Sequence, residues 1–560
     1  MTSPASSNTT EPTPTTRAAP NAGTQSNSAR QSGDTPPPAG LDALAARLAQ
    51  DLRWLALPAA SWVPPRFVDG ERVRDVVIVG GGMAGLTLSA ELQFLGIDNR
   101  QTYDRAANGH EGPWVDFARM RTLRSPKVLT GPALRLPALT FRAWFEAQFG
   151  LPAWEALNKI PREQWMDYLR WYRDVLQLPV DNGVALRRIQ PRGDGLVALT
   201  FERVLPTAAS TETAVSENDA VTAAPSVDTT QVGRVWTVLT RHVVLASGRD
   251  GLGGPSVPPI ADSLPRARWA HSADAIDFKA LSGKRVAVIG AGASAFDNAA
   301  TALEAGAASV DMVIRRADIP RVNALTGIGS PGLAYGFTAL ESEWKWRFLH
   351  YAGKVQTPPP RDSVLRVSRF PNARFRVGSA VLSMHDTEDG VRIETARGAL
   401  DVDFVIFGTG FHSRMSARPE LADIAPYVRL WQDRFTPDAG EKDSELAESP
   451  DLADDFSFQE KVPGSCPGLS RIHCFNFAAS LSAGKVSGDI PAISIGAQRL
   501  AQHLVSRLFQ DDQDTHYATL QAYDVPELQG DEWQPYLAPT SPDAFDHASS
   551  GDHVHADGGQ

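Results

Sequence analysis

Two segments of this chain share one pattern, in which an apolar run ends in a glycine-rich turn and continues into a helix-like stretch. The first copy starts at Asp75 and the second at Arg285. A G-x-G-x-x-G turn lets the backbone approach a pyrophosphate, which the amino end of the following helix attracts. A glycine turn that only packs a helix on a strand is the alternative. Two copies predict an α/β chain with two Rossmann-like dinucleotide-binding domains.

The first copy has the full context of a dinucleotide site. Gly80, Gly82 and Gly85 occupy the glycine positions, and an acidic residue, Asp104, follows roughly 20 positions later. A carboxylate at that place accepts hydrogen bonds from a ribose. Further candidate cofactor-binding residues are Met83, Ala84, Arg105, Trp114, Val184, Gly248, Gly410, Asp489 and Pro491.

The second copy differs at the end of the following strand. Gly290 and Gly292 are followed by Ala295 in the third place, and the next apolar run ends in Arg315 and Arg316 instead of an acid. Guanidinium groups favour a 2′-phosphate, so the pair predicts NADP(H) over NAD(H). A solvated basic strand end is the alternative. Ala293 and Ser294 complete the candidate cofactor-binding residues of this loop.

Composition excludes several classes of function. The chain has 560 residues and a net charge of −11, which disfavours nucleic acid as a partner. Cys466 and Cys474 are too far apart for a C-x-x-C pair, so a dithiol disulfide reductase is excluded. No apolar run is long enough for a membrane span, and the histidines, including His553 and His555, show no metal-ligand spacing. We expect a cytoplasmic enzyme without a metal or membrane partner.

The order of these motifs resembles the class B flavoprotein monooxygenases, which include flavin-containing, Baeyer–Villiger and N-hydroxylating enzymes. The resemblance covers roughly 73–510 and includes EGPW (111–114) and the paired linkers LASG and FGTG. It implies FAD on the first loop and NADPH on the second. It also implies that hydride reduces the flavin, and that a C4a-(hydro)peroxyflavin formed with O2 inserts one oxygen atom into a small organic substrate.

Two similar apolar runs, HVVLASGRDG (242–251) and DFVIFGTGF (403–411), flank the second unit and predict that the NADP domain is inserted in the FAD domain. Leucines at helical spacing from Leu41 to Leu55 predict a helix before the first domain, and 161–176 and 490–509 predict further helices. The expected segments are a disordered tail at 1–40, a helix and linker at 41–72, the FAD domain at 73–254 and 391–512 with a disordered insert at 206–232, the NADP domain at 255–390, and a tail at 513–560.

Two departures from the family pattern concern candidate catalytic residues. The family signature F-x-G-x-x-x-H is degenerate here, although His271 matches its histidine; a structural hinge role is the alternative. In TLRSPKVLTGP, Lys127 matches a segment beside the flavin, but Arg124 replaces an asparagine. Arg124 either holds an anionic substrate, or marks an altered oxygenating role, or the alignment is local coincidence.

The substrate remains open at this level. The resemblance implies an amine, a sulfide or a ketone, and a branch of FAD-dependent urate hydroxylases is a narrower interpretation. An oxidoreductase that inserts no oxygen and an inactive nucleotide-binding protein are the alternatives. The oligomeric state is not indicated by the sequence.

Overall fold

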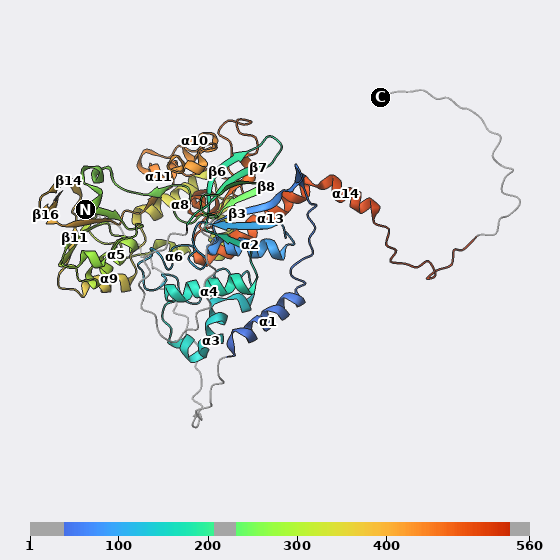
Figure 1. Ribbon diagram of the computed structural model, residues 1–560, viewed down its shortest axis with the longest axis horizontal. Helices are drawn as coiled ribbons and strands as arrows, with labels where there is room; N and C mark the ends of the chain where they lie inside the picture. The colour runs from blue at the N-terminus through green and yellow to red at the C-terminus, as the bar shows by residue number, and fades with distance from the viewer. Residues whose placement is uncertain (1–38, 206–230, 538–560) are drawn as a thin grey trace, which may run out of the picture.

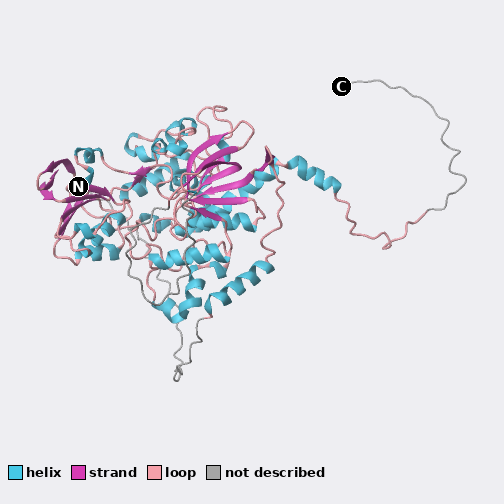
Figure 2. Cartoon of the chain, viewed as in Figure 1, coloured by secondary structure: helices cyan, strands magenta, loops and turns pink. Residues whose placement is uncertain are grey.

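A computed structural model describes residues 39–205 and 231–537. Most of the predicted N-terminal tail, most of the predicted insert and the last part of the predicted C-terminal tail lie outside these residues. The strands of the described chain gather in two lobes, one around β3 and β8 and the other around β11 and β14 (Figure 1, Figure 2). Each lobe contains one of the two glycine loops.

The first sheet is mixed, and its centre is parallel. Within the described residues its strand order is β5-β4-β3-β8-β7-β6, and β19 pairs with β8. The strands are β3 (Arg74–Val79), β4 (Arg100–Asp104), β5 (Val180–Asn182), β6 (Val184–Pro191), β7 (Val197–Arg203), β8 (Val235–Leu245) and β19 (Ile472–Cys474). The apolar run Val76, Val77 and Ile78 in β3 is fully buried, as expected of a central parallel strand covered on both faces. Helices α2 (Met83–Phe94) and α13 (Ile493–Asp511) pack against each other in this lobe.

The second sheet is wholly parallel within the described residues, in the order β10-β17-β11-β12-β13. Its strands are β10 (Trp269–His271), β11 (Arg285–Ile289), β12 (Ser309–Ile314), β13 (Ala373–Val377) and β17 (Phe404–Phe407). Helices α5 (Ala293–Glu304) and α9 (Arg361–Ser368) pack together beside this sheet. An antiparallel sheet of β14 (Val381–Thr387), β15 (Gly390–Thr395) and β16 (Gly398–Val402) completes the lobe.

The second lobe is inserted in the first. The chain leaves the first sheet after β8 and rejoins it through β19, which pairs with β8 in parallel. The outgoing and returning connections, β9 (Gly254–Pro255) and β18 (Phe411–His412), pair antiparallel. This topology confirms the predicted two-domain α/β fold.

One predicted boundary is wrong. The boundary at 390 assigned 404–407 to the first domain, but β17 lies between β10 and β11 in the second sheet. The strand is apolar and buried because neighbouring strands flank it on both sides. The sequence of β17 resembles the end of β8 because the two strands hold equivalent positions in different sheets.

The helix predicted from the leucines near the start of the chain is present. α1 (Gly40–Trp54) buries Leu44 and Leu48 and contacts α3 (Phe141–Ala156). The predicted closing helix corresponds to α13, preceded by a 3-10 turn that contains Pro491. The remaining elements are β1 (Phe67–Val68), β2 (Glu71–Arg72), α4 (Arg162–Val175), α6 (Ala324–Ile328), α7 (Pro331–Gly336), α8 (Ser342–Val355), α10 (Trp431–Arg434), α11 (Ser444–Ala447), α12 (Ser480–Ala483) and α14 (Gln513–Ala522).

The predicted C-terminal tail begins with α14, which projects away from the body (Figure 1). This helix is tied to the end of α13 by His516, whose ring stacks on Phe509 with centroids 4.4 Å apart. Across residues 39–205 and 231–537, no helix is long and apolar enough to cross a membrane.

Candidate functional site

The first glycine loop has the shape of a phosphate cradle. Gly80 has a φ of +111°, and a Cβ atom there would collide with the carbonyl oxygen of Ala246. A Cβ at Gly85 would collide with the Gly80 carbonyl, because helix α2 approaches the strand end closely. At Gly82, by contrast, the nearest atoms to such a Cβ belong to Gly112 at 3.9 Å. The loop therefore leaves room at the amino end of α2, and the residues fit a dinucleotide pyrophosphate.

Asp104 stands beside this loop and holds it. One carboxylate oxygen accepts a hydrogen bond from the Gly81 amide at 2.7 Å, and the other accepts from the Ala106 amide at 2.7 Å. Among the other predicted contacts, Arg105 is exposed, whereas Val184 is buried in the core at the start of β6. Met83 is buried in the first turn of α2 and Ala84 is half-buried.

Glu111 is a buried charged residue that the sequence analysis did not single out. Its carboxylate pairs with Arg173 at 2.9 Å and accepts from Asn182 at 2.7 Å. Burial raises the pKa of Glu111, against the lowering effect of the Asn182 hydrogen bond. The side chain lies against the loop, since a Cβ at Gly81 would lie 3.5 Å from it. The EGPW segment could have indicated Glu111, but only Trp114 of that segment was predicted to contact a cofactor. Trp114 is half-buried, and its ring centre lies 6.2 Å from that of Trp165.

The second loop repeats the geometry of the first. Gly290 has a φ of +134°, and a Cβ there would lie 2.5 Å from the carbonyl oxygen of Gly408. Ala295 is fully buried and would crowd a Cβ at Gly408, at 2.7 Å. Gly292 caps α5 with open space around it, and the neighbouring Ser294 is exposed while Ala293 is half-buried. In both sheets, then, the first glycine packs on the residue that follows the adjacent parallel strand.

The two arginines after β12 have different surroundings. Arg316 donates a hydrogen bond to the Lys354 carbonyl at 2.7 Å. Arg315 is exposed and makes no hydrogen bond or ion pair with any residue that the structure describes. The nearest following acid, Asp318, pairs with Arg321 at 2.6 Å. Arg315 is therefore the arginine that is free to meet a phosphate.

The linkers between the lobes contain the next group of predicted residues. Gly248 and Gly410 have φ values of +81° and +83°, at which any residue with a side chain would have a strained backbone. His271 lies at the end of β10 beside them; its Nδ1 accepts from the Ala273 amide at 3.1 Å, and its ring meets the edge of Phe411 at 5.6 Å. Burial lowers the pKa of His271, and only 1% of the residue is exposed. The histidine is thus enclosed at the junction of the lobes.

The two other candidate catalytic residues bind backbone carbonyls. Lys127 donates to the carbonyls of Trp154 and Glu155 at the end of α3, with its ammonium 4.8 Å from the Trp154 ring centre. Arg124 is exposed and donates to the carbonyl of Pro358 in the other lobe. Burial lowers the pKa of Arg124, while the charge of Asp297 acts to raise it. The structure does not bring these two side chains together with His271 through any contact.

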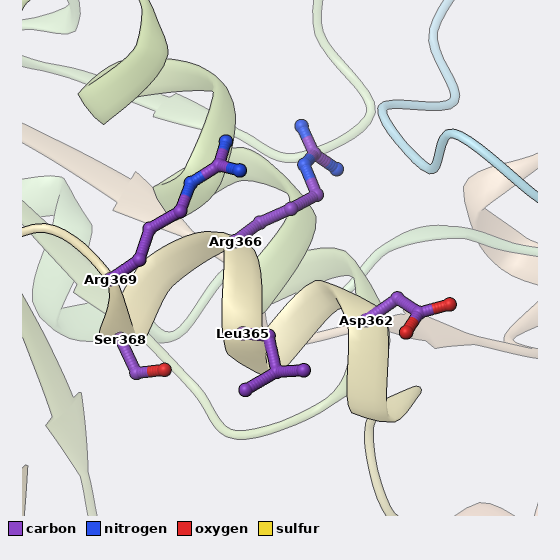
Figure 3. A pocket seen from close by; sticks show the side chains of 5 residues that line it. All are labelled: Asp362, Leu365, Arg366, Ser368 and Arg369. Atoms are coloured by element: carbon purple, nitrogen blue, oxygen red, sulfur yellow. The ribbon is translucent and has the colours of Figure 1, made fainter.

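Ion pairs link the lobes along α9. A surface hollow of about 470 Å³ follows this helix and is lined by Asp362, Leu365, Arg366, Ser368 and Arg369. Figure 3 shows Arg366 and Arg369 projecting to the same side of the helix. Both reach Glu304, at 2.9 and 3.0 Å, and Arg121 of the first lobe reaches the same carboxylate at 3.0 Å. Burial acts to raise the pKa of Glu304, but Arg366 and Arg121 outweigh it and lower the pKa.

The last predicted cofactor contacts lie before α13. Asp489 pairs with Lys485 at 3.1 Å, and Pro491 is exposed. The Phe477 amide donates to the Gly248 carbonyl at 3.4 Å, which brings this segment to the end of β8. The carboxyl ends of β3 and β8 and the start of α13 therefore meet at one edge of the first sheet, where ligands of such folds bind.

The comparisons with known proteins agree with this geometry. Residues 153–325 match the family described as L-lysine 6-monooxygenase/L-ornithine 5-monooxygenase. A FAD-dependent urate hydroxylase of Xanthomonas campestris is 35% identical over 493 residues, which cover 88% of this chain and 98% of that relative.

Solved structures share the fold at low identity. The ornithine hydroxylase of Pseudomonas aeruginosa is 17% identical, with a TM-score of 0.58 over 78% of this chain and 100% of that one. The cadaverine monooxygenase of Erwinia amylovora is 13% identical, with a TM-score of 0.56 over 84% of this chain and 100% of that one.

Proposed function

Because the chain belongs to the class B flavoprotein monooxygenases, we propose that it hydroxylates urate or a closely related purine with FAD, NADPH and O2. The chain is a FAD-dependent monooxygenase, and therefore an oxidoreductase that acts on a small molecule. The observation that carries the substrate proposal is the 35% identity to the urate hydroxylase, which extends over 98% of that relative. A cytoplasmic location and the absence of a nucleic-acid partner stay proposals; the net charge of −11 supports the second.

The two loops would hold the two cofactors. The free space at Gly82 and the carboxylate of Asp104 support FAD at the first loop, and the open Gly292 with the free Arg315 supports NADPH at the second. When bound, the flavin supplies the redox chemistry with O2. The chain's own residues bind and orient the cofactors and exclude water from the site between the lobes. The side chains of Lys127 and Arg124 bind backbone carbonyls, which fits a reaction whose chemistry the cofactors supply.

The test is product analysis under isotopically labelled O2. Purified holoenzyme with NADPH and urate should yield a product with one labelled oxygen atom, and NADPH consumption should match product formation. Ornithine and lysine serve as comparison substrates, because the matched family is named for them. NADPH oxidation that yields hydrogen peroxide and unlabelled urate would favour the alternative of an oxidoreductase without oxygen insertion.

A further inference from the structure

Arg249 is a cation with no ionic partner in the described part of the chain. It follows Gly248 directly, and its guanidinium carbon lies 3.7 Å from the centre of the Phe477 ring. Within residues 39–205 and 231–537 it makes no hydrogen bond and no ion pair. A guanidinium has five N–H donors in one plane, and stacking on a ring occupies only a face. The donors at the edge of Arg249 therefore remain available for a ligand.

Two carboxylates supply the negative charge nearest to Arg249. The side chain is exposed to solvent, yet desolvation by the surrounding protein lowers its pKa, while the charges of Glu445 and Asp489 act to raise it. Asp489 is already paired with Lys485 at 3.1 Å, and burial raises the pKa of Glu445. Neither carboxylate forms an ion pair with Arg249.

Arg249 lies next to the edge of the first sheet at which we propose that the flavin binds. Gly248 follows β8 by three residues, and β8 lies beside β3, which leads into the first glycine loop. Phe477 is held to Gly248 by its amide at 3.4 Å, and a Cβ at Gly488 would lie 3.7 Å from the Phe477 backbone. Gly488 in turn precedes the start of α13. Arg249 and Phe477 thus stand between the end of β8 and the segment before α13.

We propose that Arg249, oriented by Phe477, is the recognition site for a planar heterocyclic anion of the urate class. This inference rests on the proposed function and adds a specificity-determining residue to it. Bidentate, charge-assisted hydrogen bonds from the guanidinium edge match adjacent oxygen and nitrogen acceptors of such an anion. Arg124, which the sequence also indicates as a possible partner for an anionic substrate, donates to the Pro358 carbonyl.

The experiment compares Arg249→Met with the wild-type holoenzyme. The variant should retain FAD and its rate of flavin reduction by NADPH in the absence of substrate, whereas the dissociation constant for urate should rise about 10- to 100-fold, the size of one strong charge-assisted interaction. Calorimetric titration of the oxidised holoenzyme with urate measures this constant directly. Arg249→Lys should recover only part of the affinity, because an ammonium cannot bind in a bidentate way.

Arg142→Met is the matched control. Arg142 also lies over an aromatic ring, 5.4 Å from the centre of Trp154, but it pairs with Glu146 at 2.6 Å on α3. Its replacement should leave urate affinity unchanged. An unchanged urate affinity in Arg249→Met overturns the inference while urate hydroxylation still supports the proposed function. Loss of FAD, or a shifted flavin reduction potential with unchanged urate affinity, would assign Arg249 to the flavin and equally overturn it. A wild-type enzyme that neither binds nor hydroxylates urate would refute the proposed function itself.

Discussion

The residues at the end of the strand that follows each glycine loop differ between the two lobes. Asp104 follows the first loop and uses both carboxylate oxygens to hold backbone amides, so its charge sits at a defined place beside the cradle. Arg315 follows the second loop and is free of partners among the described residues. A fixed carboxylate suits ribose hydroxyls, and a free guanidinium suits a phosphate. We therefore propose that single side chains distinguish the two nucleotides.

Arg315→Ala should raise the Michaelis constant for NADPH by about tenfold or more, since one charge-assisted hydrogen bond contributes about 1.5–3 kcal/mol. The constant for NADH should change little, because NADH lacks the 2′-phosphate. Steady-state kinetics with both nucleotides measure the difference. Arg316→Ala is the comparison variant, and its effect should be smaller because Arg316 is engaged with Lys354. An equal loss with NADPH and NADH would contradict the phosphate assignment.

At the scale of elements, each loop contains glycines of two kinds. Gly80 and Gly85 are required by the fold, because a Cβ at either would collide with neighbouring backbone. A Cβ at Gly82 or Gly292 would meet no atom closer than 3.9 Å, so the fold does not require glycine there, and we propose that a bound pyrophosphate does. Both of the latter cap the helix that follows with ordinary φ values of −73° and −81°. They can therefore be changed with less risk to the fold than Gly80 or Gly85.

Gly82→Val and Gly292→Val form a matched pair. Gly82→Val should fold but be purified without the yellow FAD, because the new side chain blocks the pyrophosphate at α2. Gly292→Val should retain FAD and require about tenfold more NADPH or higher for flavin reduction. Absorbance spectra, thermal unfolding and stopped-flow reduction report these properties. A folded, yellow Gly82→Val protein would count against the first loop as the FAD site.

At the scale of the whole molecule, a buried charge cluster joins segments that are far apart in the chain. Arg241 in β8 lies 3.8 Å from Asp75 in β3 and contacts Asp512 at 2.7 Å and Asp511 at 3.5 Å after the inserted lobe. Asp75 is fully buried, and burial raises its pKa from 3.8 to about 6, although Arg241 acts to lower it. The cluster thus joins the chain before and after the insertion, and burial of the ionised Asp75 carboxylate opposes folding.

The effect of Asp75→Asn on stability at different pH values tests whether burial of the Asp75 carboxylate opposes folding. Because the folded pKa is raised, the carboxyl favours folding below its unfolded pKa, and this contribution is lost as pH rises through about 6. The variant should therefore have a free energy of unfolding higher than wild type by up to about 3 kcal/mol at pH 8, with the gap shrinking toward pH 5. Denaturant unfolding at several pH values measures this difference, and Asp524→Asn, at an exposed residue outside the cluster, is the control. A variant less stable than wild type at pH 8 would show that the ion pair with Arg241 dominates.

The predictable part of the site consists of features that are local in the sequence. A strand, a glycine turn, a helix and the charge at the next strand end lie within about 30 residues, so Gly80–Asp104 and Gly290–Arg315 could be identified together. The leucines of α1 and the helix α13 followed from periodicity for the same reason. The roles expected of Arg124, Lys127 and His271 could not be tested this way, because their partners Pro358, Trp154 and Phe411 lie elsewhere in the chain.

By itself, the sequence determined that this protein has two dinucleotide-binding units, because short-range patterns specify each glycine turn, and it predicts FAD for the first and NADPH for the second. Only the tertiary structure decided that β17 belongs to the second sheet, that Glu111 lies buried against the first loop, and that Arg249 lies on Phe477 without an ionic partner in the described chain. These facts depend on contacts between segments separated by the inserted lobe or by tens of residues. Burial and pairing of that kind arise only when the two sheets and the returning chain pack together.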